Sequence, residues 1–154
     1  RRLLEETRPH SIGWLSAEDP FGMSNRDFRV RRDAAARAEL GCPHFAGIFA
    51  LGAAVDYLRA LGAENIERRV LALNRHLTER LSEKGWRVLS PLRDESTRSG
   101  ETLVEASRPK RVVAHLARKG VTVTEKPEGI RVATHFFNDE DDIARLIDAL
   151  EDCK

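Results

Sequence analysis

The sequence predicts an α+β fold, in which a long αα-hairpin precedes a small, mostly antiparallel sheet that is covered by helices. Between residues 45 and 84, apolar residues recur at steps of three and four, a spacing that is typical of helices with one buried face. After residue 85 the pattern changes to short β-branched runs separated by proline and glycine. With 154 residues, 41% of them hydrophobic, the chain forms one domain or a large piece of a bigger protein.

Two helices are expected in the first half of the chain. The first follows Gly41-Cys42-Pro43 and ends at Gly62, because proline suits a first helical turn and glycine suits a helix end. Its many glycines and alanines favour close packing against another helix or a second subunit. The second helix runs from about Ala63 to Lys84, and Gly85 ends it. Its buried face is expected to contain Ile66, Val70, Leu73, Leu77 and Leu81.

The second half of the chain predicts short strands, turns and two further helices. Pro109 opens a short helix that Gly120 ends, and Pro127-Glu128-Gly129 forms a turn. Asn138 caps a last helix, whose acidic first turn complements the helix dipole. The expected strands are Trp86 to Leu89, Leu103 to Ala106, Val121 to Thr124 and Ile130 to Thr134.

Residues 8–29 predict a long irregular segment, because prolines and glycines interrupt them and no periodicity is present. Segments of this length in compact proteins are usually functional or disordered. The apolar residues of this segment, Trp14 among them, argue against disorder, because such groups normally dock on another part of a protein.

The charge and the cysteine content limit the classes of function that the sequence suggests. The chain carries 26 basic and 25 acidic residues, so its net charge of +1 gives no general reason to expect binding to nucleic acid or a membrane. We interpret the arginine-rich segment from Arg26 to Arg37 as an exposed loop or a salt-bridged interface. No apolar run is long enough to span a bilayer, and no apolar signal core follows the first arginines. Cys42 and Cys153 lie far apart and the histidines are scattered, so we expect no metal site and a reduced, cytoplasmic protein.

The strand from Ile130 to Thr134 contains the most informative side chain, Arg131. Alternate residues of a strand share a face, so Ile130, Val132 and Thr134 are expected to face the core. Arg131, Ala133 and His135 would then face away from it, with a small residue leaving room for a ligand. A guanidinium suits bidentate binding of a carboxylate or phosphate. The alternative is that Arg131 only pairs with an acidic residue on a neighbouring element.

The turn Gly41-Cys42-Pro43-His44 is a second candidate site, because it directly precedes a helix. Free backbone N–H groups and the positive end of the helix dipole make such a turn suited to phosphate. Plain helix capping explains the same residues. Cys42 could have a lowered thiol pKa at this position, or it could be a buried, inert cysteine.

Ala38 to Gly47, the alanine-rich helix to Gly62, and Gly129 to Asn138 before an acidic helix start occur in this order. Together these blocks resemble the class V aminotransferase family, the cysteine desulfurase-like group of fold type I pyridoxal-phosphate enzymes. The short link from Val123 to Arg131 and the run His135-Phe136-Phe137-Asn138 are most similar to the isopenicillin N epimerase-like branch. The opening residues through Trp14 resemble the segment after the cofactor-lysine strand in that family. The resemblance therefore covers essentially the whole chain and implies a C-terminal portion.

This resemblance implies roles for four residues in a homodimeric, pyridoxal-phosphate-dependent enzyme. Arg131 would bind the α-carboxylate of the amino-acid substrate, and Trp14 would belong to an active-site loop. Gly41 and Cys42 stand where the family commonly has Gly-Thr-Pro, a turn that reaches the cofactor phosphate of the other subunit. Cysteine lacks the threonine hydroxyl, so only backbone donation carries over. Residues 1–40 would hold an interdomain helix end and an active-site loop segment, and residues 41–154 a C-terminal small domain with its leading helices.

The resemblance also indicates what this chain lacks. No histidine-cysteine loop, which carries the desulfurase nucleophile, lies between Val121 and Arg131, so persulfide chemistry is in doubt. The aspartate that pairs with the pyridine nitrogen is missing, and no lysine has the strand-end context of the cofactor lysine. The chain also begins without methionine, in what reads like the middle of a helix. We therefore expect an incomplete enzyme that is inactive by itself.

Two hypotheses about function remain. The first is the C-terminal part of a pyridoxal-phosphate enzyme that acts on an amino acid as a transaminase, lyase, epimerase or desulfurase-like enzyme. The second is a non-enzymatic regulatory or interaction module with a ferredoxin-like fold. A strand at residue 103, a helix at 109, strands at 121 and 130 and a helix at 139 would fit that fold, which hosts many functions.

Overall fold

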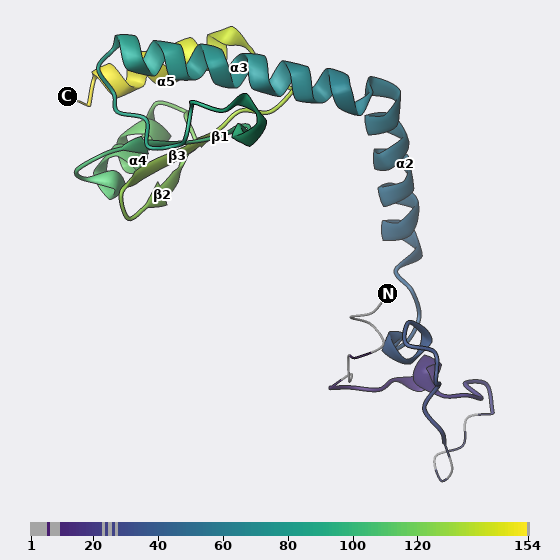
Figure 1. The fold of residues 1–154 in the computed structure, drawn as a ribbon. Helices are drawn as coiled ribbons and strands as arrows, with labels where there is room; N and C mark the ends of the chain where they lie inside the picture. The colour runs from purple at the N-terminus through teal and green to yellow at the C-terminus, as the bar shows by residue number, and fades with distance from the viewer. Residues whose placement is uncertain (1–5, 7–9, 23, 25, 27, 154) are drawn as a thin grey trace. The chain divides into compact units, whose positions relative to one another are not determined.

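A computed structural model describes residue 6 and residues 10–22, 24, 26 and 28–153 (Figure 1). The helical start expected at residues 1–6 lies almost entirely outside these residues. The chain forms two compact units, Arg1–Val55 and Asp56–Lys154, and helix α2 (Phe45–Leu61) contains the boundary between them. The predicted division at residue 40 concerns functional parts rather than compact units, and it stays a prediction.

The first unit consists mainly of loops around two 3-10 turns, η1 (Trp14–Ser16) and η2 (Ala36–Ala38). A single antiparallel bridge between Ala17 and Val30 joins two stretches of the loop. This agrees with the irregular segment predicted for residues 8–29. Helix α2 begins in this unit at Phe45, two residues later than the position of Pro43 suggests.

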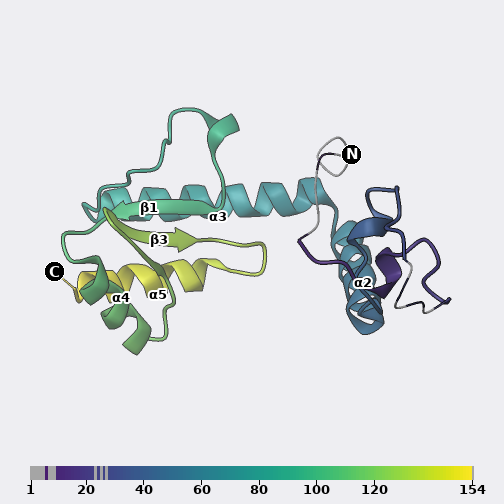
Figure 2. The ribbon, with the colours of Figure 1, turned by 90° about the horizontal axis from the view of Figure 1, so that it is seen from below.

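The second unit is a three-stranded antiparallel sheet packed against helices. Its strands are β1 (Glu101–Glu105), β2 (Thr124–Lys126) and β3 (Gly129–Ala133), in the order β1-β3-β2. Helices α3 (Ala63–Glu83), α4 (Pro109–Arg118) and α5 (Glu140–Glu151) pack on it, and α3 and α5 lie side by side (Figures 1 and 2). A 3-10 turn, η3 (Glu95–Thr97), lies in the loop before β1. The predicted fold class is confirmed.

The core of the second unit lies between one face of the sheet and these helices. In β3, the side chains of Ile130 and Val132 are 0% and 6% exposed, so the predicted inward face is confirmed. Buried residues from α3, α4 and α5 meet them, and fully burying a leucine side chain stabilises a protein by about 1.5–3 kcal/mol. The helical contributors are Leu73, Leu77, Leu81, Leu116, Ile143, Leu146, Ile147 and Leu150. All of these helices therefore cover the same face, and no described helix of the second unit covers the other face, which is called the open face below.

The two long helices do not form the expected αα-hairpin. Only Gly62, with φ at 84°, separates α2 from α3, and the chain bends there by 74°. An antiparallel helix pair is joined by a loop of roughly two to five residues, so a single glycine changes the direction of the chain without reversing it. None of the described helices is by itself long and apolar enough to cross a membrane; α2 and α3 pass that test only as a bent pair.

Two of the predicted strands are shorter than expected. The stretch Trp86 to Leu89 keeps one bridge, between Val88 and Val104, because the N–H of Leu103 donates to the side-chain oxygen of Ser90 instead of a carbonyl. The strand expected at Val121 begins only at Thr124. Here the N–H of Val121 still donates to Leu116 of α4, at 2.9 Å, and closes the helix end rather than a sheet.

The last helix is capped by Asp139 rather than by Asn138. The carboxylate of Asp139 accepts the N–H of Asp142 at 2.9 Å, and the carboxylate of Asp142 accepts the N–H of Asp139 at 3.4 Å. The amide of Asn138 donates to Asp142 at 2.9 Å, and this bond is the first cause that holds the Asp142 pKa below its ordinary value. Asn138 thus supports the cap from outside, since its own oxygen accepts the N–H of His135.

Replacing Asp139 by alanine is expected to lower the free energy of unfolding by about 0.5–2 kcal/mol, because the N–H of Asp142 loses its acceptor. Urea unfolding followed by circular dichroism measures this change. Asp141→Ala is the matched control, since Asp141 lies in the same acidic turn but does not cap it. Equal losses in the two variants would show that only the helix dipole, and not the cap, is involved.

Candidate functional site

Arg131 lies on the open face of β3, as its alternation predicts, and its side chain is 37% exposed. One guanidinium nitrogen, Nη1, lies 3.2 Å from Glu101 on β1, and Nη2 donates to the hydroxyl of Thr124 on β2 at 3.4 Å. The third nitrogen, Nε, is buried and meets no partner among the residues that the structure describes. The neighbouring carboxylate of the alternative interpretation therefore exists, but it does not satisfy the whole guanidinium.

The ion pair with Glu101 does not commit Arg131 to a structural role. Both side chains are partly exposed, at 37% and 58%, and such surface pairs contribute roughly 0–1 kcal/mol. A ligand carboxylate can therefore replace Glu101 at little cost. A bidentate ligand would gain charge-assisted bonds and could also meet the buried Nε. The open face of β3 is consequently suited to an anionic group.

Shortly after β3, the rings of three consecutive residues lie close together. The imidazole of His135 stacks on Phe137, with centroids 4.6 Å apart and planes at 26°, and lies 4.5 Å from Phe136. His135 and Phe137 are both exposed. The structure confirms that His135 faces away from the core, in an aromatic cluster at the edge of the open face.

The turn before α2 has free backbone donors. Among the described residues, the N–H groups of Gly41, Cys42 and His44 donate to no acceptor. The N–H of Phe45 donates to Pro43 at 2.9 Å, so the helix begins with its first donors pointing out of the turn. Cys42 is exposed and free, so the interpretation as a buried cysteine is wrong. The geometry matches a site for phosphate, which needs such unpaired donors at a helix start.

Ser16 holds the loop of Trp14 beside this turn. Its hydroxyl accepts the N–H of Gly13 at 3.1 Å and donates to the carbonyl of Glu39 at 2.8 Å, and its side chain is 1% exposed. Gly13 lies against the chain before Gly41 so closely that a Cβ atom there would be 1.6 Å from the carbonyl oxygen of Leu40. These two contacts fix the distance between the loop and the turn.

Trp14 and Gly41 are consequently neighbours. A Cβ atom on Gly41 would lie 3.4 Å from the indole nitrogen of Trp14, which is ordinary van der Waals distance, so the ring lies directly beside this turn. The indole also meets Phe21 edge to face, with centroids 5.7 Å apart. The structure thus brings together three of the predicted residues, Trp14, Gly41 and Cys42, in the first unit, whereas Arg131 belongs to the second.

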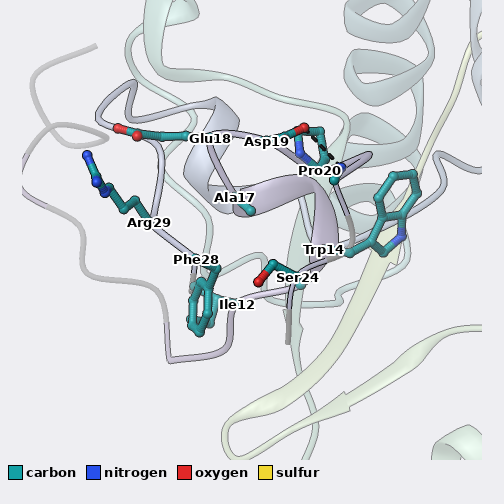
Figure 3. A pocket seen from close by; sticks show the side chains of 11 residues that line it. Ile12, Trp14, Ala17, Glu18, Asp19, Pro20, Ser24, Phe28 and Arg29 are labelled. Carbon is teal, nitrogen blue, oxygen red and sulfur yellow. Dashed lines mark hydrogen bonds between the residues drawn. The ribbon is translucent and has the colours of Figure 1, made fainter. Parts of the chain in front are cut away.

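The loop of Trp14 lines an open pocket of about 670 Å³ within the first unit (Figure 3). Ile12 and Phe28 lie together on one side of it, and Glu18 and Arg29 on another. The carboxylate of Asp19 accepts the N–H of Gly22 at 3.0 Å and closes the turn beside it. The apolar walls and a few charged groups are typical of a ligand cavity. Sequence reasoning did not single out this pocket or Ser16.

The profile of the aminotransferase class-V family matches residues 1–146 of the chain. The chain belongs to this family. It is 31% identical, over 127 residues, to a probable cysteine desulfurase from Pseudomonas putida, a match that covers 73% of the chain and 31% of that protein. It is 28% identical to the isopenicillin N epimerase of Amycolatopsis lactamdurans, with 94% and 39% of the two chains covered.

The fold matches that of solved enzymes. The cysteine desulfurase of Thermococcus onnurineus superimposes with a TM-score of 0.82, over 99% of this chain and 41% of that one, at 20% identity. The chain thus spans between 31% and 39% of the two relatives' length. The expected resemblance to fold type I pyridoxal-phosphate enzymes is confirmed.

Ser16→Ala is expected to lower the free energy of local opening around Trp14 by about 0.5–1.5 kcal/mol, since the partly buried hydrogen bond to the carbonyl of Glu39 is lost. Hydrogen exchange measured on the segments at residues 10–20 and 36–44 would become faster. Ser11→Ala is the control, because Ser11 is exposed and lies in the same loop. Unchanged exchange in Ser16→Ala would show that this hydroxyl does not hold the two segments together.

Proposed function

We propose that this chain is part of a pyridoxal-phosphate-dependent enzyme that acts on an amino acid, and that it supplies substrate-carboxylate and cofactor-phosphate contacts. The observation that carries the proposal is the half-exposed guanidinium of Arg131, paired on one side and unsatisfied at Nε. Membership of the class V aminotransferase family gives the cofactor class. The substrate and the reaction type within this family are a separate question.

Arg131 binds the α-carboxylate of the substrate in this proposal. The rigid strand β3 holds the guanidinium in place from both sides, because β3 is hydrogen-bonded to β1 and β2. Glu101 keeps Arg131 charge-compensated before substrate arrives and leaves when the ligand carboxylate takes its place. Holding the carboxylate fixes the orientation of the α-carbon, which lowers the entropy cost of reaching a reactive geometry.

The turn at Gly41 to His44 contacts the phosphate of the cofactor in the partner subunit. Its unpaired N–H groups and the start of α2 favour an anion, and the exposed Cys42 side chain adds no hydroxyl. Trp14 stands against Gly41 and forms an apolar wall beside this turn. Pyridoxal phosphate, bound mainly by residues outside this chain, supplies the electron sink for chemistry at the α-carbon.

The enzyme acts as a homodimer in this proposal. Helix α2 supports this interpretation, because none of its residues is buried and large apolar side chains project from it. Exposed apolar patches of this kind mark protein interfaces. The exposed residues are Phe45, Ile48, Phe49, Leu51, Val55, Tyr57 and Leu58.

Sulfur transfer through a protein thiol is not supported. Strands β2 and β3 are joined by a tight turn at Pro127 and Glu128, and this hairpin contains no cysteine. The ferredoxin-like alternative receives no separate support either. The β-α-β-β-α order is present in the structure, but the family match over residues 1–146 already accounts for it.

In the full-length enzyme, Arg131→Ala is expected to raise KM for amino acids by about thirtyfold, because a charge-assisted pair worth ~2 kcal/mol is lost. Steady-state kinetics with amino acids and with the amines that lack their carboxylate would measure this effect. The variant should lose its preference for the amino acid and leave the weak activity on the amine unchanged. Unchanged kinetics with amino acids would contradict the carboxylate role.

Glu101→Gln separates this role from a purely structural ion pair. It removes the partner of Arg131 but leaves the guanidinium, so KM for amino acids should stay the same or fall. If Arg131 served only to pair with Glu101, both variants would raise KM alike.

The chain of residues 1–154 alone is expected to be inactive, because its opening residues resemble the segment after the cofactor-lysine strand. Lys126 ends strand β2, but it belongs to the hairpin with β3. Purified chain mixed with pyridoxal phosphate and treated with borohydride should show no covalent adduct by intact-mass measurement. A stable adduct on one lysine, with its absorbance band, would refute this assignment.

A further inference from the structure

Within the second unit, a groove runs beside helix α4, and the proposed function does not use it. Its volume is about 680 Å³, and it lies between α4 and the C-terminal end of α5. The core-facing side chain of Ile130 and the open-face side chain of Arg131 do not line it. Basic and aromatic groups do, namely Arg108, Arg111, His115, Arg118 and Trp86.

The basic groups follow one side of α4. Arg108 is the residue before the helix, and Arg111, His115 and Arg118 follow at steps of three and four. Such steps place side chains on one helical face, and ten residues at 1.5 Å each give a stripe of about 15 Å. The inner side of the same helix faces the core, where Leu116 is fully buried. The stripe is therefore a fixed row of basic side chains on a helix whose other side is held in the core.

The arginines of this row give the groove an excess of positive charge. None of the three arginines forms an ion pair with any described residue, whereas Lys119, next along the chain, pairs with Asp152 at 2.7 Å. Asp152 is the carboxylate that lines the groove, and this bond to Lys119 already occupies it. In a chain with 26 basic and 25 acidic residues, three unpaired guanidinium groups in one groove are a local excess.

Two further side chains of the groove, His115 and Trp86, favour a bound partner. The Nε2 atom of His115 is buried and meets no partner in the described part of the chain. A buried polar atom without a partner costs about 1–3 kcal/mol, which an incoming group could offset. Trp86 packs against the core and lines the same groove. Tryptophan and arginine are the residues most enriched where protein interfaces gain their affinity.

We propose that this groove is a docking site for an extended acidic segment of a partner protein. The length of the row decides between an acidic segment and a small anion. A single phosphate group reaches one or two guanidinium groups, whereas an extended chain presents carboxylates on one side about every 6.6 Å. Two or three such carboxylates match a row of about 15 Å, and each can take a bidentate bond from arginine.

Fluorescence anisotropy with the full-length protein tests this proposal. The probe is a labelled ten-residue peptide of alternating glutamate and serine, measured at 0.15 M salt. Arg108→Gln, Arg111→Gln and Arg118→Gln combined should weaken its binding by at least about tenfold. The control combines Arg68→Gln, Arg93→Gln and Arg145→Gln, three exposed arginines outside the groove, and has the same net charge. It should bind the peptide like the unmodified protein.

Further measurements decide the remaining outcomes. Thermal unfolding compares the stability of the two glutamine variants. A third variant replaces the same three arginines of the groove by lysine, which keeps the charge but removes the planar guanidinium. Its binding to the peptide should be weaker than that of the unmodified protein. No binding by the unmodified protein, or an equal loss in both glutamine variants, would overturn the proposal. Sodium tripolyphosphate that binds more tightly than the peptide, with the same arginine dependence, would replace it with a small-polyanion site.

Discussion

The burial of one face of strand β3 is the constraint on which the second unit depends. Ile130 and Val132 pack under three helices, and Thr134 continues this inward row. Because side chains alternate, burying these residues forces Arg131 outward, and a slip of one residue would bury its charge. The same register pairs Arg131 with Leu103 of β1 and Thr124 of β2. Core packing, rather than the ion pair with Glu101, therefore determines where the guanidinium lies.

In the first unit, hydrogen bonds rather than core packing hold the loops in position. Its loops have few buried apolar residues, so one serine, Ser16, connects the backbone at Gly13 and at Glu39. This arrangement needs no side chain at residue 13, where the chain passes against Leu40. Weakly packed loops open more easily than helices and strands. We therefore expect the loops of this unit to open more readily than the helices and strands of the second unit.

Much of the second unit could be predicted from sequence because its signals are local. The helical period places the apolar residues of α3 and α5 on one face. The two-residue period of a strand explains the alternation at Ile130 to Ala133. The errors arose where hydrogen bonds of individual side chains decide. Ser90 replaces a carbonyl in the ladder near Leu103, and Asp139 competes with Asn138 for the cap. The association of Trp14 with Gly41 likewise depends on Ser16, which no pattern in the sequence distinguishes from other serines.

The ion pair of Arg131 and the carboxylate role are compatible rather than opposed. A binding arginine that faced solvent alone would keep its full hydration, and a ligand would have to remove it. Glu101 already replaces part of the water around the guanidinium of Arg131. An exposed ion pair is weak, so a ligand carboxylate can take the position of Glu101. The unsatisfied Nε then favours the ligand over Glu101, because only a second acceptor can meet it. Among the residues that the structure describes, the arginines beside α4 have no such ion-pair partner, which is why we propose an occupant that brings its own charge.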